Sequence, residues 1–99
     1  MPYVIMFVDD PGVIEKKKRV RPVHLQYVLK NAHRIITSGG LFPDDADFPN
    51  GGLIILDTDM RQDAIDYIEN DPFYLNGIFS TYTVSRWRKF IFDYKPISS

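Results

Sequence analysis

The chain has no cysteine among its 99 residues. This absence excludes disulfide frameworks, cysteine-ligated zinc, iron–sulfur clusters and thiol nucleophiles. An excess of one charge sign is also missing, because 12 Lys and Arg residues stand against 13 Asp and Glu residues and the formal net charge is −1. Dedicated nucleic-acid-binding domains are usually strongly basic, so this balance argues against nucleic acid as a partner.

Long apolar runs are lacking as well. The apolar segment Tyr3–Val8 is far shorter than the roughly 20 residues that span a membrane as a helix. Asp9 and Asp10 end it and no basic region precedes it, so it does not match a secretory signal. We therefore expect a cytoplasmic protein without a membrane segment.

The residues that are present make an ordinary folded composition, with 44% apolar and 25% charged residues. The length suits one domain. We assign residues 1–92 to this domain and residues 93–99 to a C-terminal tail, to which no role is given.

Four strands are predicted where β-branched, aromatic and apolar residues are bounded by turn signals. Along the last of these segments the apolar residues switch from one face of the strand to the other. A β-bulge is therefore expected near Ser85 and Arg86. The predicted strands are Tyr3–Val8, Arg34–Ser38, Gly52–Leu56 and Ile78–Phe92.

The first helix is predicted over Pro22–Ala32, because apolar residues recur at i, i+3, i+4 and i+7 from Leu25. Proline suits its first turn, where a missing N–H costs nothing. Residues 13–20 before it are expected to form a loop with some helical character. His33 follows the helix, and we expect it to adopt the left-handed conformation that often ends a helix.

The second helix is expected to begin after Thr58 or Asp59. Asp59 and Gln62 have the spacing of a capping box. Pro72 ends this helix, because the residue before a proline disfavours helical dihedral angles.

The order βαββαβ predicts an α+β, ferredoxin-like fold, with a four-stranded antiparallel sheet and two helices on one face. Both faces of the strands Tyr3–Val8 and Gly52–Leu56 are apolar, unlike a sheet with one wet face. Two helices cover only one of these faces. The simplest cover for the other is the sheet of a second copy, so we expect a homodimer.

Arg21 and His24 open the first predicted helix and lie on neighbouring parts of one helix face. A helix N-terminus favours the neutral imidazole, which is the form a general base requires, and attracts anions. The alternative is a half-buried histidine bonded to backbone. These two residues alone favour that structural alternative.

Asp71 closes the second helix in the segment Asp-Pro-Phe. A carboxylate at a helix C-terminus faces the negative end of the dipole and gains from a cationic partner, such as a histidine. The alternative is a turn residue that hydrogen-bonds its own backbone. The motif alone again favours the structural alternative.

No metal or cofactor site is expected. The acidic residues Asp45 and Asp47 begin a calcium-loop pattern, but Pro49 stands where a ligand is needed and the downstream glutamate is missing. The glycine pairs at 39–40 and 51–52 are interpreted as turns and not as phosphate-binding loops. Trp87 lies in a basic segment, and we interpret it as a packing residue.

The sequence resembles the YCII-related domain family over nearly its whole length. The resemblance rests on an Arg-Pro-x-His segment followed, in order and at fitting spacing, by an Asp-Pro-aromatic segment and a glycine. The matching segments are Tyr3–Ile5, Arg21–Leu25, Arg34–Gly39, Gly52–Ile55, Asp71–Phe73, Gly77–Phe79 and Arg86–Lys89.

The resemblance implies a ferredoxin-like chain of the dimeric α+β barrel type. It implies that His24 and Asp71 are catalytic, with Arg21 beside them as a substrate-binding residue. The family includes a dehydrochlorinase that acts on a chlorinated hydroxyquinol. Two positions depart from the family pattern: Gly40 replaces a proline, and His33 replaces a helix-ending glycine.

These observations together favour a small homodimer with a His/Asp pocket that performs general acid–base chemistry without a cofactor. Lyase, isomerase or dehydrohalogenase chemistry on a small anionic, aromatic or enol-containing compound would fit. The alternatives are a non-catalytic domain that binds a small molecule or regulates a partner, and a weak nucleic-acid module built on Arg86–Lys89. The loop from Leu41 to Asn50 is expected to be mobile, and it is equally interpreted as a lid or as a passive loop.

Overall fold

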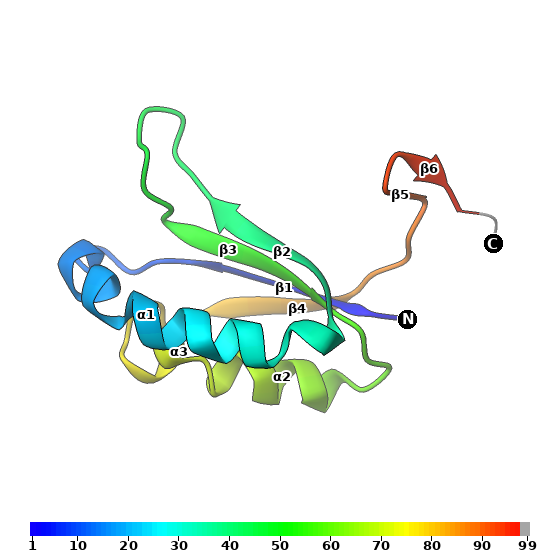
Figure 1. Cartoon of the computed structure of the whole chain (residues 1–99), viewed down its shortest axis with the longest axis horizontal. Helices are drawn as coiled ribbons and strands as arrows, with labels where there is room; N and C mark the ends of the chain where they lie inside the picture. The colour runs from blue at the N-terminus through cyan, green and yellow to red at the C-terminus, as the bar shows by residue number, and fades with distance from the viewer. Residues whose placement is uncertain (98–99) are drawn as a thin grey trace.

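The computed structural model describes residues 1–97. Four strands form one sheet, and a short hairpin follows near the C-terminus (Figure 1). The elements in chain order are β1 (Tyr3–Val8), α1 (Ile14–Lys30), a 3₁₀ turn (Ala32–Arg34), β2 (Ile35–Leu41), β3 (Gly51–Leu56), α2 (Arg61–Glu69), α3 (Pro72–Leu75), β4 (Tyr82–Arg86), β5 (Ile91–Phe92) and β6 (Lys95–Pro96).

The main sheet has the strand order β2-β3-β1-β4, and every neighbouring pair is antiparallel. The helices all lie against one face of it, as Figure 1 shows. The ferredoxin-like α+β fold is therefore confirmed, with α3 as a short additional helix. Within residues 1–97, no helix is both long enough and apolar enough to cross a membrane.

Alternation along β1 separates the two faces of the sheet. Tyr3, Ile5 and Phe7 point toward the helices and are buried. Met6 and Val8 point the other way and are 41% and 64% exposed. The helix-facing side thus forms the core, and the opposite side is apolar but uncovered by residues 1–97.

Helix α1 begins at Ile14, so the expected loop over residues 13–20 is wrong, and Pro22 lies inside the helix. The sequence of residues 14–21 shows no regular helical spacing of apolar residues, because Lys17, a charged residue, occupies a buried position of the helix. Its side chain is paired with Asp9, which offsets part of the cost of burying a charge at a core position. Tertiary contacts therefore stabilise the first turns, which sequence periodicity does not reveal.

The two helix termini also differ from expectation. His33 lies in the 3₁₀ turn, and among the described residues only Asp93 and Tyr94 have a positive φ outside glycine. The N-cap of α2 is Met60, so neither Thr58 nor Asp59 caps it. The Asp59 carboxylate instead accepts from the N-terminal amine at 2.6 Å.

The last predicted strand, Ile78–Phe92, is wrong in length. Ile78 and Phe79 are buried before the strand begins, and β4 covers only Tyr82–Arg86. The β1–β4 register is continuous, so there is no bulge at Ser85 and Arg86. The irregularity lies in β2 instead, between Ile35 and Thr37.

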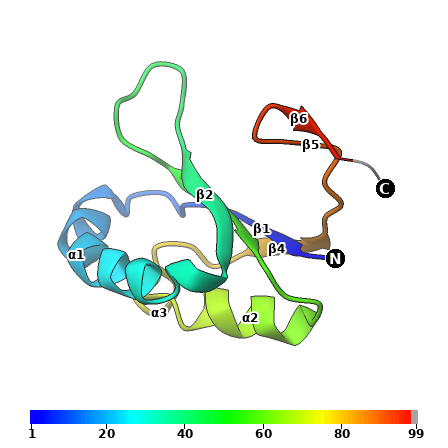
Figure 2. The ribbon, with the colours of Figure 1, turned by 45° about the vertical axis from the view of Figure 1, so that its right-hand side comes forward.

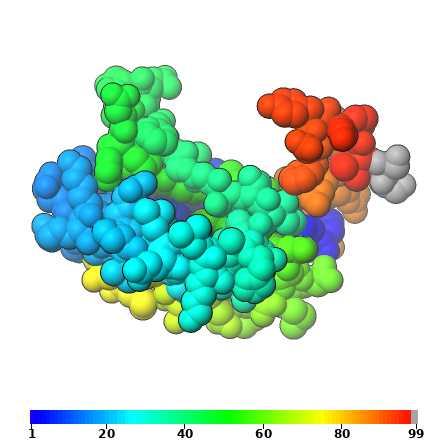
Figure 3. Space-filling model, viewed as in Figure 1, coloured from blue at the N-terminus to red at the C-terminus, as the bar shows by residue number. Residues whose placement is uncertain are grey.

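Two segments project from the sheet on the side opposite the helices (Figures 1 and 2). One is the loop between β2 and β3, and the other is the β5–β6 hairpin, whose turn contains Asp93 and Tyr94. In the space-filling view both stand clear of the body of the molecule (Figure 3).

The glycine pairs interpreted as turns lie inside strands, where Gly40 pairs with Gly52. A β-carbon on Gly51 would lie 2.4 Å from the carbonyl oxygen of Phe7, whereas one on Gly39 would meet no atom within 4 Å. Gly51→Ala should therefore lower the free energy of unfolding by about 1–3 kcal/mol through overpacking. Gly39→Ala is the matched control and should change it little. Urea unfolding of both variants tests this, and equal stabilities would contradict it.

Candidate functional site

A cavity of about 220 Å³ lies between α1 and the end of the sheet formed by β2 and β3. On the helix-facing side, these strands contribute the small residues Ser38, Gly40 and Gly52 to its lining. The apolar part of the wall consists of Phe7, Leu25, Val28, Leu53, Ile54 and Phe73, and the polar part of Lys17, Arg21, His24, Ser38, Tyr67 and Asp71.

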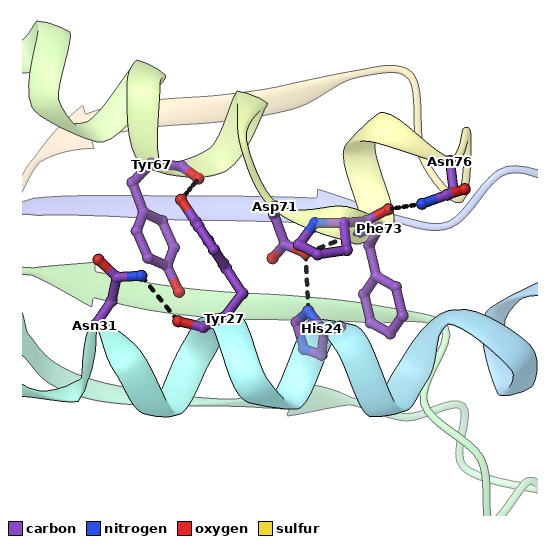
Figure 4. A network of polar contacts seen from close by, with 8 residues as sticks. His24, Tyr27, Asn31, Tyr67, Asp71, Phe73 and Asn76 are labelled. Carbon is purple, nitrogen blue, oxygen red and sulfur yellow. Dashed lines mark hydrogen bonds and ion pairs between the residues drawn. The ribbon is translucent and has the colours of Figure 1, made fainter.

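His24 and Asp71 meet at this cavity, although 47 positions separate them (Figure 4). The Nδ1 atom of His24 lies 2.8 Å from Oδ1 of Asp71. The Asp71 residue is 1% exposed, so solvent screens this contact weakly. The structure thus brings together the two residues that the sequence suggested as a pair.

Asp71 reaches His24 because a second helix begins directly after α2. Asp71 is the N-cap of α3, and the same Oδ1 atom accepts from the backbone N–H of Phe73 at 2.9 Å. The expectation of a carboxylate facing the negative end of α2 is therefore replaced by a capping carboxylate, which is favourable. The Asp71 side chain thus both hydrogen-bonds its own backbone, as a turn residue does, and contacts a histidine.

Phe73 fixes the orientation of the imidazole. Its ring stacks on the His24 ring with centroids 3.8 Å apart and planes 8° apart. The N–H at Nδ1 donates to the carboxylate of Asp71, which leaves Nε2 as the nitrogen with a free lone pair in the neutral ring. Nε2 is therefore the atom of His24 that is suited to accept a proton from a ligand.

Arg21 lies one turn before His24 on α1 and lines the same cavity. It also lines an adjoining hollow with Phe42 and Phe48 of the loop between β2 and β3. A guanidinium at this mouth can bind a carboxylate or an oxyanion through two parallel hydrogen bonds. The lid interpretation of the loop stays a prediction.

Lys17 is a cavity residue that sequence reasoning missed. Its Nζ atom lies 2.7 Å from Oδ2 of Asp9 and 3.0 Å from the carbonyl oxygen of Pro49. Both charged side chains are nearly buried, at 3% and 8% exposure. The spacing of Lys17, Arg21 and His24 at i, i+4 and i+7 is the signal that could have revealed it, because such residues share one helix face.

Tyr67 is the second residue that sequence reasoning missed. It belongs to α2, lines the cavity and is 2% exposed. Burial, and then the negative charge of Asp71, raise the pKa of its phenol well above the ordinary value. The apolar spacing along α2 does not distinguish a tyrosine that packs in the core from one that lines a cavity.

Across residues 1–97, no three His, Cys, Asp or Glu side chains gather as a metal-binding group. Asp45 and Asp47 lie exposed in the projecting loop, and Trp87 is half-buried after β4. The polar side chains that line the cavity come from α1, α2, β2 and Asp71.

Residues 1–88 match the family model described as the YCII-related domain. The protein YciI of Escherichia coli is 27% identical over 96 residues, which cover 90% of this chain and 98% of that protein. A protein from Haemophilus influenzae is 29% identical over the same coverage.

Two solved structures are similar in fold. The 5-chloro-2-hydroxyhydroquinone dehydrochlorinase of Burkholderia phenoliruptrix, in complex with 2,5-dihydroxybenzoquinone, superposes with a TM-score of 0.82 at 24% identity, covering 89% of this chain and 94% of that one. A protein from Agrobacterium tumefaciens has a TM-score of 0.51 at 14% identity, covering 99% of this chain and 100% of that one.

The buried ion pair between Lys17 and Asp9 is expected to stabilise the fold. Lys17→Met should lower the free energy of unfolding by about 3–5 kcal/mol, because it leaves the Asp9 charge buried without its partner. Adding Asp9→Asn should recover a large part of the loss. Chemical denaturation measures both changes.

The matched control is Lys18→Met, since Lys18 is an exposed neighbour whose contact with Glu15 is 3.7 Å long. An exposed pair of this kind contributes at most about 1 kcal/mol. If Lys17→Met were no more destabilising than Lys18→Met, the buried pair would have no structural role.

Proposed function

The chain belongs to the YCII-related domain family, and from this premise we propose that it is an enzyme in which His24 acts as a general acid–base. The proposed substrate is a small, anionic, oxygen-bearing ring compound. The observation that carries the proposal is the 2.8 Å contact between Nδ1 of His24 and Oδ1 of Asp71 at the wall of the cavity.

In the proposed reaction, Nε2 of His24 takes a proton from a hydroxyl or an acidic C–H of the substrate. The bonding pair left behind becomes part of a new double bond in the substrate. If His24 returns the proton to another atom, the result is an isomer; if a leaving group departs with its own bonding pair, the result is an elimination. The carboxylate of Asp71 stabilises the imidazolium that forms in either case.

Arg21 is proposed to bind the negative charge of the substrate. Its guanidinium is always charged, and its geometry matches a carboxylate or a pair of ring oxygens. The charge of Lys17 is already offset by Asp9, so Arg21 supplies the cationic character of the cavity mouth.

The substrate class is supported by the size of the cavity and by the similar fold of a dehydrochlorinase that is in complex with 2,5-dihydroxybenzoquinone. A cavity of about 220 Å³ accommodates one substituted six-membered ring. Its wall is apolar over most of its extent, with polar groups converging at a few points, which is typical of a site for a small organic ligand.

The catalytic role is tested by chloride release from 5-chloro-2-hydroxyhydroquinone. His24→Ala should lower the rate by about 10²–10⁴-fold, which is the usual loss of a general acid–base. Asp71→Asn should also lower it, because the amide no longer stabilises the imidazolium. The matched control is His33→Ala, since His33 is exposed on the 3₁₀ turn.

A rate that is equal in the native protein and in His24→Ala would refute the catalytic role of His24. Binding of the compound without turnover would identify the chain as a small-molecule-binding domain instead.

The uncovered face of the sheet is proposed to pack on a second copy of the chain. Met6 and Val8 are exposed on this face, and Phe90, Ile91 and Tyr94 are 65–99% exposed at the hairpin that projects on the same side (Figure 1). The hairpin and the loop between β2 and β3 rise on either side of this face and could hold a partner sheet between them. Burying such side chains stabilises association by about 1.5–3 kcal/mol each.

Met6→Asp should therefore dissociate the homodimer without unfolding the subunit, because a charge would be buried between the sheets. Leu29→Asp is the control, since Leu29 is 72% exposed on α1, away from this face. Light scattering at micromolar concentration measures both. A native protein that is monomeric under these conditions would overturn the dimer.

A further inference from the structure

Tyr67 places a buried polar group at the cavity without a protein partner. Among the described residues, its hydroxyl oxygen is buried and makes no hydrogen bond. An unpaired buried hydroxyl is unfavourable, so such groups are rare in folded proteins unless they have a function or a bound partner. The hydroxyl belongs to a residue that lines the cavity, so a ligand there can satisfy it.

The tyrosine ring is held in place by contacts that do not involve its hydroxyl. The Tyr27 hydroxyl donates to the backbone carbonyl of Tyr67 at 2.7 Å, and the two rings lie 5.2 Å apart. The guanidinium of Arg34 lies 5.8 Å from the Tyr67 ring. In Figure 4 the hydroxyl end of Tyr67 points away from α2 toward α1. These contacts hold the ring with its hydroxyl oxygen in a buried position.

Helix α1 orders the polar groups along the cavity. The cavity residues Lys17, Arg21 and His24 come first, and Tyr27, which does not line the cavity but contacts Tyr67, comes after them. Each three-residue step advances about 4.5 Å along a helix. Tyr67 thus lies on the far side of His24 from the cationic mouth of the cavity.

We infer that the Tyr67 hydroxyl donates a hydrogen bond to an oxygen of the bound ligand and so determines which ring compounds the site accepts. The ligand carries negative charge on the side that faces Arg21 and an acceptor oxygen on the opposite side of the ring. This inference rests on the proposed function, because it concerns the same cavity, and it adds the substitution pattern of the substrate.

The chemistry of the phenol agrees with this role. Because burial and the charge of Asp71 raise the pKa of Tyr67, the phenol keeps its proton and acts as a donor. A site with a buried donor rejects an analogue that lacks the acceptor, since the donor would then stay unpaired. Compounds without an oxygen opposite the anionic group should therefore bind more weakly.

Calorimetric titration with 2,5-dihydroxybenzoquinone tests the inference. This compound carries oxygens on opposite sides of one ring. Tyr67→Phe should bind it about tenfold more weakly than the native protein, which is the usual loss for one hydrogen bond. The melting temperature of ligand-free Tyr67→Phe should be equal or higher, because the substitution removes an unpaired buried hydroxyl and keeps the ring. A merely structural tyrosine would show no loss of affinity.

Tyr74→Phe is the matched control, because Tyr74 packs on Phe79 and Tyr82 and does not line the cavity. It should bind the compound as the native protein does. If Tyr67→Phe also binds like the native protein, the inference is overturned and the proposed function stands. If the native protein does not bind the compound, the proposed substrate class and the inference both fail.

Discussion

One carboxylate oxygen holds the candidate site together. Oδ1 of Asp71 accepts from the backbone of Phe73 and from Nδ1 of His24, so it caps the start of α3 and attaches that helix to α1. The Phe73 ring, which follows the capping residue, stacks on the imidazole of His24. Because the carboxylate is buried, these contacts are weakly screened by solvent. The direction in which Nε2 of His24 points is a consequence of this capping interaction.

Two glycines of the sheet form part of the cavity wall. Gly40 and Gly52 lie opposite one another on the helix-facing side and are closely packed, because a β-carbon on Gly52 would lie 2.8 Å from the Phe7 ring and one on Gly40 would lie 3.0 Å from Pro49. Lys17 closes one end of it through its bonds to Asp9 and to the carbonyl of Pro49. A buried ion pair is expensive to form, and here it also ties the start of α1 to the base of the projecting loop. Lys17, whose charge interrupts the apolar pattern of α1, therefore helps to hold the elements around the cavity in place.

The two faces of the sheet have different relations to function. The helix-facing side holds the core and the cavity, whereas the other side exposes apolar residues such as Met6 and Val8. The hairpin β5–β6 extends on this second side (Figure 2). Its residue Tyr94 is almost fully exposed. Catalysis and association are thus proposed for opposite faces, so that each can be altered without the other.

Local patterns in the sequence were sufficient for the strands β1 and β3, for the βαββαβ order and for the motifs that contain His24 and Asp71. Alternation and turn residues are short-range properties, and they can be recognised without knowing what packs against them. Their limits are visible in α1, where Lys17 is buried only because Asp9 lies beside it, and in the last strand, where Ile78 and Phe79 pack before β4 begins. The 2.8 Å approach of His24 to Asp71 and the unpaired hydroxyl of Tyr67 belong to the tertiary structure alone. They depend on how α1, α2 and α3 lie against one sheet, and contacts over such separations leave no periodic signal in the chain.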